Sequence, residues 1–348
     1  MEVNNVWLGW GLGDNSKSDF TVQKFKEFAK RMYASYCSDL DDTNLFDQSM
    51  QDHVSEIQTR LANDNHLVWG EFILGVLDLP TEYATGFKSK VIPWLISVEG
   101  HQSNMWTGPC ADTATQLSGE QDNKGNARGR HQPTGYKNGD IPFNNADGVE
   151  ALRANIANAI AAGADIYLLG YSQSMIVIYD YLKKYGIPPK LKGILAYGNP
   201  CRKLASIADW AKSWVTRLNL HGLDPYNRFG LAGCPDPEAQ GIPFADVYRE
   251  YDIFAQNGDD EEGKMKAAVY QAVARSDLFS NPYSLGSLVL SLFTSFTLEY
   301  IVTFIFNIMM ASGSGIEFLA DDPNPHYSPY DITGGKDWLR NLLIANAA

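Results

Sequence analysis

Hydrophobic residues recur at helical spacing in the first part of the chain. One amphipathic helix is predicted by the apolar set Val22, Phe25, Phe28, Ala29 and Met32. A second helix, with Asp47 as its N-cap, is predicted by the stripe Met50, Val54, Ile57 and Leu61. Residues 79–90 are interpreted as a linker. We therefore expect a small helical module over residues 1–88 and a second domain over residues 89–348.

The pattern changes after residue 90, where short apolar runs alternate with amphipathic segments. Buried strands are predicted over residues 91–98, 165–169, 191–197 and, later in the chain, 246–252. Helices are predicted over residues 113–117 (with Asp112 as the cap), 148–162, 175–185 and 336–345. Such alternation is typical of an α/β domain, in which helices cover both faces of a central parallel sheet.

Residues 288–310 form an unusually long apolar block, which raises the question of a membrane-spanning helix. Glu299 stands at its middle and Asn307 near its end. An ionisable group at the centre of a bilayer costs on the order of a few kcal/mol, so we expect no firm membrane span. The block is interpreted as part of a helical, lid-like insertion over residues about 262–320. Peripheral contact with lipid is the alternative.

Composition narrows the choice of partners. The 348 residues carry a formal net charge of −13 and no basic cluster, so nucleic acid is not expected as a partner. The absence of a C-x-x-C pair excludes zinc ribbons and redox motifs. Two disulfides are arithmetically allowed, but buried free thiols are the simpler reading of the four cysteines, Cys37, Cys110, Cys201 and Cys234. The N-terminus lacks the basic start and apolar core of a Sec signal peptide.

The segment Gly170-Tyr171-Ser172-Gln173-Ser174 follows a predicted strand and precedes a predicted helix. A nucleophilic serine on such a sharp turn needs small residues two positions before and after it, because the strand and the helix pass close by. Gly170 meets this requirement, while Ser174 stands where glycine is usual. The context predicts a serine hydrolase of the α/β-hydrolase type with Ser172 as nucleophile.

Such an enzyme needs backbone donors for the oxyanion that forms during acyl transfer. The N–H of Gln173, at the start of the helix, is one candidate. The second donor normally comes from the loop after the first strand, where the backbone of His101 is our candidate. The alternative is that His101 is a loop residue with no part in catalysis.

A base and an acid are expected after the serine, with the acid first in chain order. His326 lies in a proline-rich loop close to the final helix, where this fold usually places its histidine. His221 breaks the order and is the less favoured base. Asp252 is the preferred acid because it falls where the late strand gives way to a loop. Asp246 and Glu250, in the same strand, remain as rivals.

No cofactor and no metal are expected. The other histidines, His53, His66 and His131, have no ligand spacing and are interpreted as surface or capping residues. No phosphate-binding loop is present.

Several segments resemble known families. The turn at residues 170–174 resembles the nucleophile motif of the cutinases. Flanking segments resemble mycobacteriophage lysin B, namely VEGH (98–101), TGPCADTA (107–114), QPTGY (132–136) and YGNPCR (197–202). The resemblance covers roughly residues 90–345. It departs from lysin B at His101, where threonine or serine is usual, and at Ser174.

The resemblance implies an esterase that cleaves the bond between mycolic acids and arabinogalactan during phage-mediated lysis. Such a protein is made in the host cytoplasm and acts at the cell envelope after release by a route other than Sec. The triad maps onto Ser172, Asp252 and His326, and the apolar block suits a surface that receives long acyl chains. Some relatives carry a peptidoglycan-binding module, to which residues 50–61 are similar; the alternative is a helical pair that only packs on the hydrolase.

Two other functions stay open from the sequence. The triad also suits a general cutinase or lipase acting on short acyl esters or triglycerides. A protein of another class would bind the wall without catalysis, on a degenerate hydrolase scaffold. The ordered serine, acid and histidine argue against this last reading, because drift would remove the serine or the histidine first.

Overall fold

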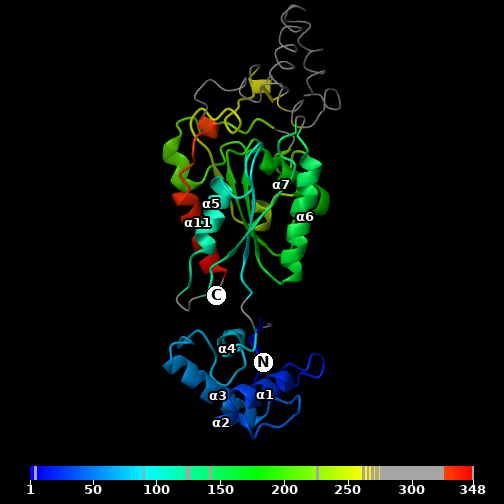
Figure 1. Cartoon of the computed structure of the whole chain (residues 1–348), viewed down its shortest axis with the longest axis vertical. Coiled ribbons are helices and arrows are strands. Elements are labelled where there is room, and N and C mark those ends of the chain that lie inside the picture. The colour runs from blue at the N-terminus through cyan, green and yellow to red at the C-terminus, as the bar shows by residue number, and fades with distance from the viewer. Residues whose placement is uncertain are drawn as a thin grey trace, which may run out of the picture. The chain divides into compact units, whose positions relative to one another are not determined.

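The computed structural model describes residues 1–3, 6–88, 91–122, 126–140, 143–224, 227–260, 263–264, 266–267, 270, 274 and 325–346. These divide into two compact units, Met1–Val91 and Ile92–Ala348 (Figure 1). The boundary falls three residues after the one that we expect from the sequence.

The first unit contains a short antiparallel pair, β1 (Glu2–Val3) with β2 (Val6–Trp7), and four helices in its described part. The helices are α1 (Thr21–Met32), α2 (Ala34–Cys37), α3 (Gln48–Asn63) and α4 (Leu79–Thr85). Both predicted amphipathic helices are confirmed as α1 and α3, and Asp47 caps α3 by accepting from Met50 N at 2.8 Å. Met32, predicted on the apolar face, is instead 58% exposed.

Helix α4 corrects the prediction of a linker over residues 79–90. The Asp78 side chain accepts from Thr81 N at 3.0 Å, which satisfies a free N–H group in the first turn. Pro80 is tolerated there because the first helical N–H groups have no partner within the helix. Gly86, with φ of 79°, ends the helix. Pro80 and Gly86, both within the range interpreted as a linker, therefore mark the two ends of a short helix.

The second unit is built on a parallel sheet with the strand order β4-β3-β5-β6-β7. The strands are β3 (Trp94–Val98), β4 (Arg130–Pro133), β5 (Ile166–Tyr171), β6 (Leu191–Tyr197) and β7 (Phe244–Val247). Nearly every residue of β3, β5 and β6 is buried, as expected for strands covered on both faces. Their register places the ends of β3, β5 and β6 side by side, with Val98 opposite Gly170 and Gly170 opposite Ala196.

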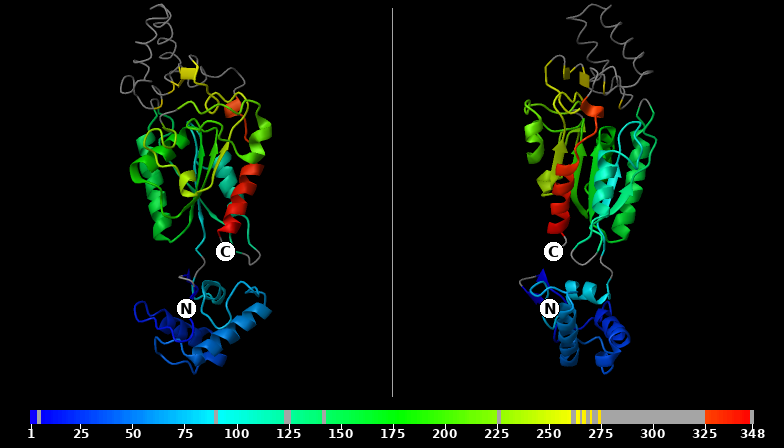
Figure 2. Two further views of the ribbon diagram at one scale, coloured as in Figure 1. Left: turned by 180° about the vertical axis from the view of Figure 1, so that it is seen from behind. Right: turned by 60° about the vertical axis from the view of Figure 1, so that its left-hand side comes forward.

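Within the described residues, the two faces of the sheet are covered by helices α5 (Pro109–Ser118), α11 (Thr333–Ala345), α6 (Asn145–Ala161) and α7 (Gln173–Tyr185), as Figures 1 and 2 show. Helices α5 and α11 pack together on one face, with a core that includes Leu95, Leu169 and Leu195. Helices α6 and α7 cover the other face, with Ile96, Leu168 and Ile194. Alternate residues of each strand thus face opposite layers. This is the predicted α/β architecture.

Two of the differences between the predicted and the observed boundaries bear on the site. Strand β7 ends at Val247, so Asp252 lies in the turn beyond it and not at the strand's end. Asp112 lies in the first turn of α5, whose N-cap is Gly108. The Glu99 carboxylate, from the loop after β3, accepts from Ala111 N at 2.7 Å and so caps α5 from outside the helix. A cap supplied by a distant residue leaves no local sequence signal.

The four cysteines are buried free thiols, as the simpler reading of the sequence has it. No helix among the described residues is long and apolar enough to cross a bilayer. The predicted insertion, including the apolar block at residues 288–310, lies almost wholly outside the described residues.

Candidate active site

Ser172 lies on a sharp turn between β5 and α7. Its φ of 56° places a non-glycine residue in the left-handed region, which is costly and typical of strained functional turns. A Cβ on Gly170 would lie 2.4 Å from Met175 Sδ and 2.7 Å from Ile178 Cδ1, so any larger residue at that position requires these side chains of α7 to move. A Cβ on Gly100, in the loop after β3, would lie 3.0 Å from Ser172 Cβ. The two glycines allow the strand, the helix and the neighbouring loop to converge on one hydroxyl group.

The structure brings the three predicted side chains together. Ser172 Oγ lies 2.8 Å from His326 Nε2, and His326 Nδ1 lies 3.0 Å from both carboxylate oxygens of Asp252. Because an ionised carboxylate can only accept, Nδ1 carries the proton and Nε2 is left to accept from the serine hydroxyl. His326 and Asp252 are fully buried. Hydroxyl, imidazole and carboxylate thus form a line of hydrogen bonds.

The imidazole of His326 fits a close-packed space. Gly198, with φ of 52°, follows β6, and a Cβ there would lie 2.6 Å from His326 Cε1. The ring of Tyr171 stacks on the imidazole with centroids 5.2 Å apart, and Phe254 packs at 4.4 Å. Tyr171 also donates its hydroxyl to the backbone oxygen of His326 at 2.8 Å. The glycine in the YGNP segment therefore makes room for the base.

The Asp252 carboxylate is held by several donors besides the imidazole. Its Oδ1 accepts from Phe254 N at 3.0 Å and from Ala255 N at 3.2 Å, and its Oδ2 accepts from Tyr330 Oη at 3.0 Å. Burial raises the pKa of Asp252, but His326, Tyr330 and the Ala255 N–H favour its charged form, and the pKa is lowered overall. The group is therefore an anion fixed in one orientation.

The rival residues are occupied elsewhere. Asp246 accepts from Asn199 Nδ2 at 2.7 Å and Ser206 Oγ at 2.6 Å, and burial raises its pKa to about 6. The Glu250 carboxylate bonds Thr216 N and Arg217. Neither carboxylate contacts His326 in the described part of the chain.

The less favoured base, His221, is also engaged away from the serine. Its Nε2 lies 3.0 Å from Asp259 Oδ1 and its Nδ1 lies 2.6 Å from Gly222 O. Chain order in the sequence and distances in the structure therefore select the same histidine, His326.

The two proposed oxyanion donors flank the nucleophile. Gln173 is the first residue of α7, and His101 directly follows Gly100, which touches the turn. Neither backbone N–H donates to another residue that the structure describes. These N–H groups are therefore free to donate hydrogen bonds to a substrate oxygen that becomes negatively charged.

The side chains of His101 and Gln173 point to neighbouring segments and have contacts that the sequence does not predict. Burial lowers the pKa of His101, whose ring packs against Phe143 with centroids 5.0 Å apart. Its nitrogens face the Gln173 amide and the backbone of Asn138, but form no hydrogen bond of ordinary geometry with a described residue. Gln173 Nε2 donates to Asn145 Oδ1 at 3.1 Å, which joins the start of α7 to the start of α6.

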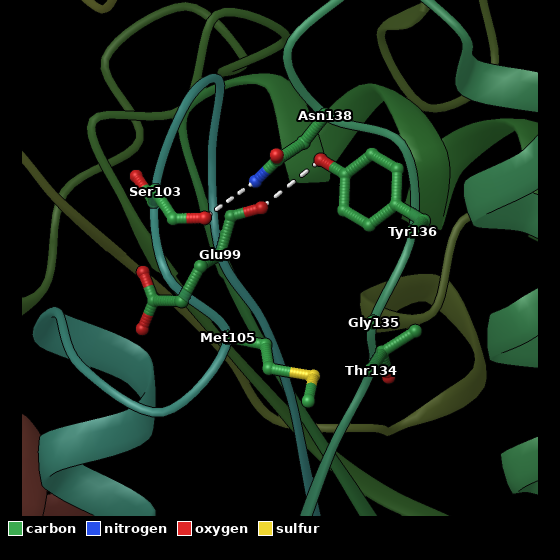
Figure 3. A pocket seen from close by; sticks show the side chains of 7 residues that line it. All are labelled: Glu99, Ser103, Met105, Thr134, Gly135, Tyr136 and Asn138. Carbon is green, nitrogen blue, oxygen red and sulfur yellow. Dashed lines mark hydrogen bonds between the residues drawn. The ribbon is translucent and has the colours of Figure 1, made fainter.

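A small pocket lies beside the loop that carries His101 (Figure 3). Its volume is about 120 Å³, and it is lined by Glu99, Ser103, Met105, Thr134, Gly135, Tyr136 and Asn138. Asn138 Nδ2 donates to the backbone oxygens of Gly100 at 2.7 Å and Ser103 at 2.8 Å. Tyr136 Oη donates to Glu99 O at 3.0 Å. These bonds hold the loop after β3 against the segment after β4.

No group of three potential metal ligands occurs among the described residues. His66 is exposed, and His53 pairs with Asp39 at 3.0 Å. His131 differs from the prediction of a surface or capping residue. It is half-buried on β4, where Nε2 lies 2.7 Å from Ser97 Oγ and Nδ1 lies 3.0 Å from Thr115 Oγ1. This second serine–histidine pair has no carboxylate bonded to the ring in the described structure.

Sequence reasoning missed three residues that surround the triad: Tyr171, Tyr330 and Arg249. Tyr171 stands inside the nucleophile motif, but nothing in the motif shows that its ring reaches the histidine. Tyr330 and Arg249 carry no signal at all, because their contacts depend on how two loops meet. Arg249 lies over the Tyr330 ring, with 4.5 Å between the guanidinium carbon and the ring centroid.

Comparison with known proteins agrees with this fold. No protein-family profile and no curated protein sequence matches the chain. Among solved structures, lysin B from mycobacteriophage D29 matches with a TM-score of 0.54 and 24% identity, covering 71% of this chain and 99% of lysin B. A cutinase-like protein from Cryptococcus sp. matches with a TM-score of 0.38 and 18% identity, covering 51% of this chain and 87% of the cutinase-like protein. Lysin B is also the protein whose segments the sequence resembles, and the second unit of this chain shares its α/β-hydrolase fold.

Proposed function

We propose that the second unit is a serine esterase with Ser172 as nucleophile, His326 as base and Asp252 as the acid that orients it. One observation carries this proposal: Ser172 Oγ, His326 and Asp252 form an unbroken line with contacts of 2.8 Å and 3.0 Å. A hydrolytic triad requires this arrangement of hydroxyl, imidazole and carboxylate. The strained turn under the serine is the usual site of the nucleophile in this fold.

The first step forms an acyl-enzyme. His326 Nε2 takes the proton of Ser172 Oγ as the oxygen attacks the ester carbonyl, and the carbonyl electron pair moves to the oxygen. When the tetrahedral intermediate collapses, the C–O bond to the alcohol breaks. The alcohol leaves with the proton from His326. Water then repeats the sequence, with His326 as base, and releases the carboxylic acid.

Two sets of groups stabilise the charges that form. The backbone N–H groups of Gln173 and His101 donate to the oxyanion, which exists only in the transition state and intermediate. The buried Asp252 carboxylate stabilises the imidazolium while staying ionised. Because these groups are in place before reaction, no reorganisation is needed when charge develops.

For the substrate, we propose the ester between mycolic acids and arabinogalactan, cleaved during phage-mediated lysis of a mycobacterial host. The resemblance of segments such as residues 98–101 and 197–202 to lysin B supports this substrate class. The fold shared with lysin B supports the hydrolase scaffold alone. The site of action would then be the host envelope, with mycolyl-arabinogalactan as partner. Binding of peptidoglycan by the first unit is a separate proposal, supported by the similarity of residues 50–61.

Covalent trapping tests the nucleophile. The full chain is treated with a fluorophosphonate, digested and mapped, and the label should lie on Ser172 and be absent from Ser172→Ala. Ser97→Ala is a matched control, because Ser97 also contacts a histidine at 2.7 Å but lacks the carboxylate. It should keep its labelling and its hydrolysis of p-nitrophenyl esters. Near wild-type hydrolysis by Ser172→Ala would remove the assignment, since loss of the nucleophile costs on the order of 10⁶-fold in related chemistry.

A second experiment tests the substrate class. Release of mycolate from purified mycolyl-arabinogalactan is compared with hydrolysis of triolein and of short acyl esters by the same preparation. We expect mycolate release that disappears in Ser172→Ala. Hydrolysis of triolein without mycolate release would leave an esterase but replace its proposed substrate with that of a general lipase.

A further inference from the structure

Three carbonyl oxygens of the loop that carries His326 accept hydrogen bonds from side chains of other segments. Pro325 and Pro329, on either side of the histidine, have no backbone N–H and leave their carbonyls to find donors. Within the described structure these donors are side chains from other segments. Arg249 donates to both Pro325 O, at 3.1 Å, and Pro329 O, and Tyr171 donates to His326 O at 2.8 Å.

Arg249 also connects this loop with the loop of the acid. Its own backbone oxygen accepts from Asp252 N at 3.2 Å, so its main chain belongs to the turn that carries the carboxylate. Its guanidinium lies over the ring of Tyr330, and Tyr330 donates its hydroxyl to Asp252 Oδ2 at 3.0 Å. One residue therefore contacts the base's loop at two points and the acid's loop at a third.

We propose that Arg249 is a positioning residue of the triad: its guanidinium clamps the carbonyls on both sides of His326 and fixes the imidazole between Ser172 and Asp252. The inference rests on the proposed esterase function. A planar guanidinium suits this task because it offers donors in a fixed fork and can span two acceptors, while an ammonium offers a single point. Displacement of a reacting group by about 1 Å can cost on the order of 10²-fold in rate, which makes such a clamp consequential.

The clamp predicts a specific kinetic pattern. Arg249→Met keeps much of the side chain's length and loses all donors, so the imidazole should lose its fixed position while the substrate surface is unchanged. We expect kcat for a p-nitrophenyl ester to fall about 10- to 100-fold with KM within about twofold of wild type. Arg249→Lys should recover only part of this loss. Full recovery by lysine would overturn the clamp and leave charge as the cause.

Arg217→Met is the matched control. Arg217 lies over the ring of Tyr251 at 4.7 Å and pairs with Glu250 at 3.0 Å, so it repeats the arginine–tyrosine contact beside the same acid loop. It has no contact with residues 325–330 in the described structure. Its kcat should stay within about threefold of wild type. An equal loss in Arg217→Met and Arg249→Met would show a general effect of the loop and overturn the proposal.

A readout besides activity separates this inference from the proposed function. The proton on His326 Nδ1, bonded to Asp252, should give a downfield resonance in the wild-type spectrum, and that resonance should broaden or vanish in Arg249→Met. An unchanged resonance overturns the clamp, whether or not the wild type hydrolyses esters. An inactive wild type that lacks fluorophosphonate labelling contradicts the proposed function instead.

If Arg249→Met does not fold, Tyr171→Phe tests the same loop. It removes the bond to His326 O and keeps the aromatic stack. This variant, like Arg249→Lys, should have a lower kcat than wild type and a weaker resonance from the His326 Nδ1 proton. A variant with wild-type kcat and an unaltered resonance would show that carbonyl tethers do not position the base.

Discussion

The hydroxyl of Ser174 forms hydrogen bonds with both backbone polar groups of Tyr171. Its Oγ accepts from Tyr171 N at 2.6 Å and donates to Tyr171 O at 2.9 Å. Tyr171 is the last residue of β5, directly before Ser172 and its left-handed backbone. Ser174 stands where the related motif usually has glycine, and here its side chain holds the backbone at the entry to the strained turn.

Removal of this hydroxyl should weaken the turn. Ser174→Ala removes the two hydrogen bonds that the hydroxyl forms with the Tyr171 backbone, so we expect the free energy of unfolding to fall by about 1–2 kcal/mol. Urea unfolding of the full chain measures this change, and the rate of p-nitrophenyl ester hydrolysis should fall with it. Ser174→Gly should be at least as destabilised, because glycine adds backbone freedom to the unfolded chain. Wild-type stability in both variants would show that the hydroxyl has no structural part.

The identity of the acid can be tested by paired neutral substitutions. Asp252→Asn removes the charge that stabilises the imidazolium, and kcat should fall on the order of 10³- to 10⁴-fold. Glu250→Gln, two residues earlier, alters only the bonds to Thr216 and Arg217 and should leave kcat within about threefold. Steady-state kinetics on one ester substrate compare the two. A larger loss in Glu250→Gln would assign the acid to the rival position.

Gly100 should be intolerant of any side chain. A Cβ there would lie 2.9 Å from Tyr171 O and 3.0 Å from Ser172 Cβ, so Gly100→Ala must push the loop of His101 away from the nucleophile. We expect kcat to fall at least about tenfold, since a displaced oxyanion donor costs about 10²- to 10³-fold when it is lost entirely. Circular dichroism serves as the folding check, and Gly139→Ala, where nothing lies within 4 Å of the added Cβ, is the control. Equal kinetics in the two variants would mean that the loop has room to spare.

Local sequence patterns predict much of this fold because burial leaves a periodic signal. Strand β6 and the strand core of β3 follow from apolar runs, and the caps and apolar stripes of α1 and α3 are visible directly. The linker predicted over residues 79–90 is wrong because Pro80 and Gly86 mark the two ends of helix α4, and both residue types also occur in linkers. Strand β7 was placed too late, since the apolar pattern continues into the turn that leads to Asp252.

The order of residues along the chain predicts the candidate triad, but the sequence does not predict which side chains meet across two loops. The serine turn and the order of acid and base single out three residues that the structure brings within hydrogen-bond distance. Tyr330 and Arg249 could not be found this way, because each acts across two loops that meet only in the folded chain. Glu99 belongs to the VEGH segment, but nothing in the local sequence predicts that its carboxyl group is buried against α5.

The carboxyl group of Glu99 is buried, which is uncommon for a glutamate. Its side chain is about 1% exposed, Oε1 accepts from Ala111 N, and Oε2 has no hydrogen-bond partner among the described residues. Burial raises the pKa of Glu99 to about 8, although the Ala111 and Cys110 N–H groups favour the charged form. A Cβ on Gly108 would lie 2.6 Å from Oε2, so the carboxyl group fills the space beside that glycine.

This burial gives a pH dependence of known sign. Burial raises the pKa of Glu99 in the folded state, so protonation of Glu99 stabilises the fold most below pH 4.5, the pKa in the unfolded chain. This contribution to the free energy of unfolding is lost as the pH rises from 4.5 toward 8. The loss is at most about 1.4 kcal/mol per pH unit in this window. Glu99→Gln is neutral at every pH, so its stability should match wild type near pH 5 and exceed it near pH 9. Urea unfolding at both pH values measures the difference, and a gap that stays constant or closes with rising pH would contradict a protonated Glu99.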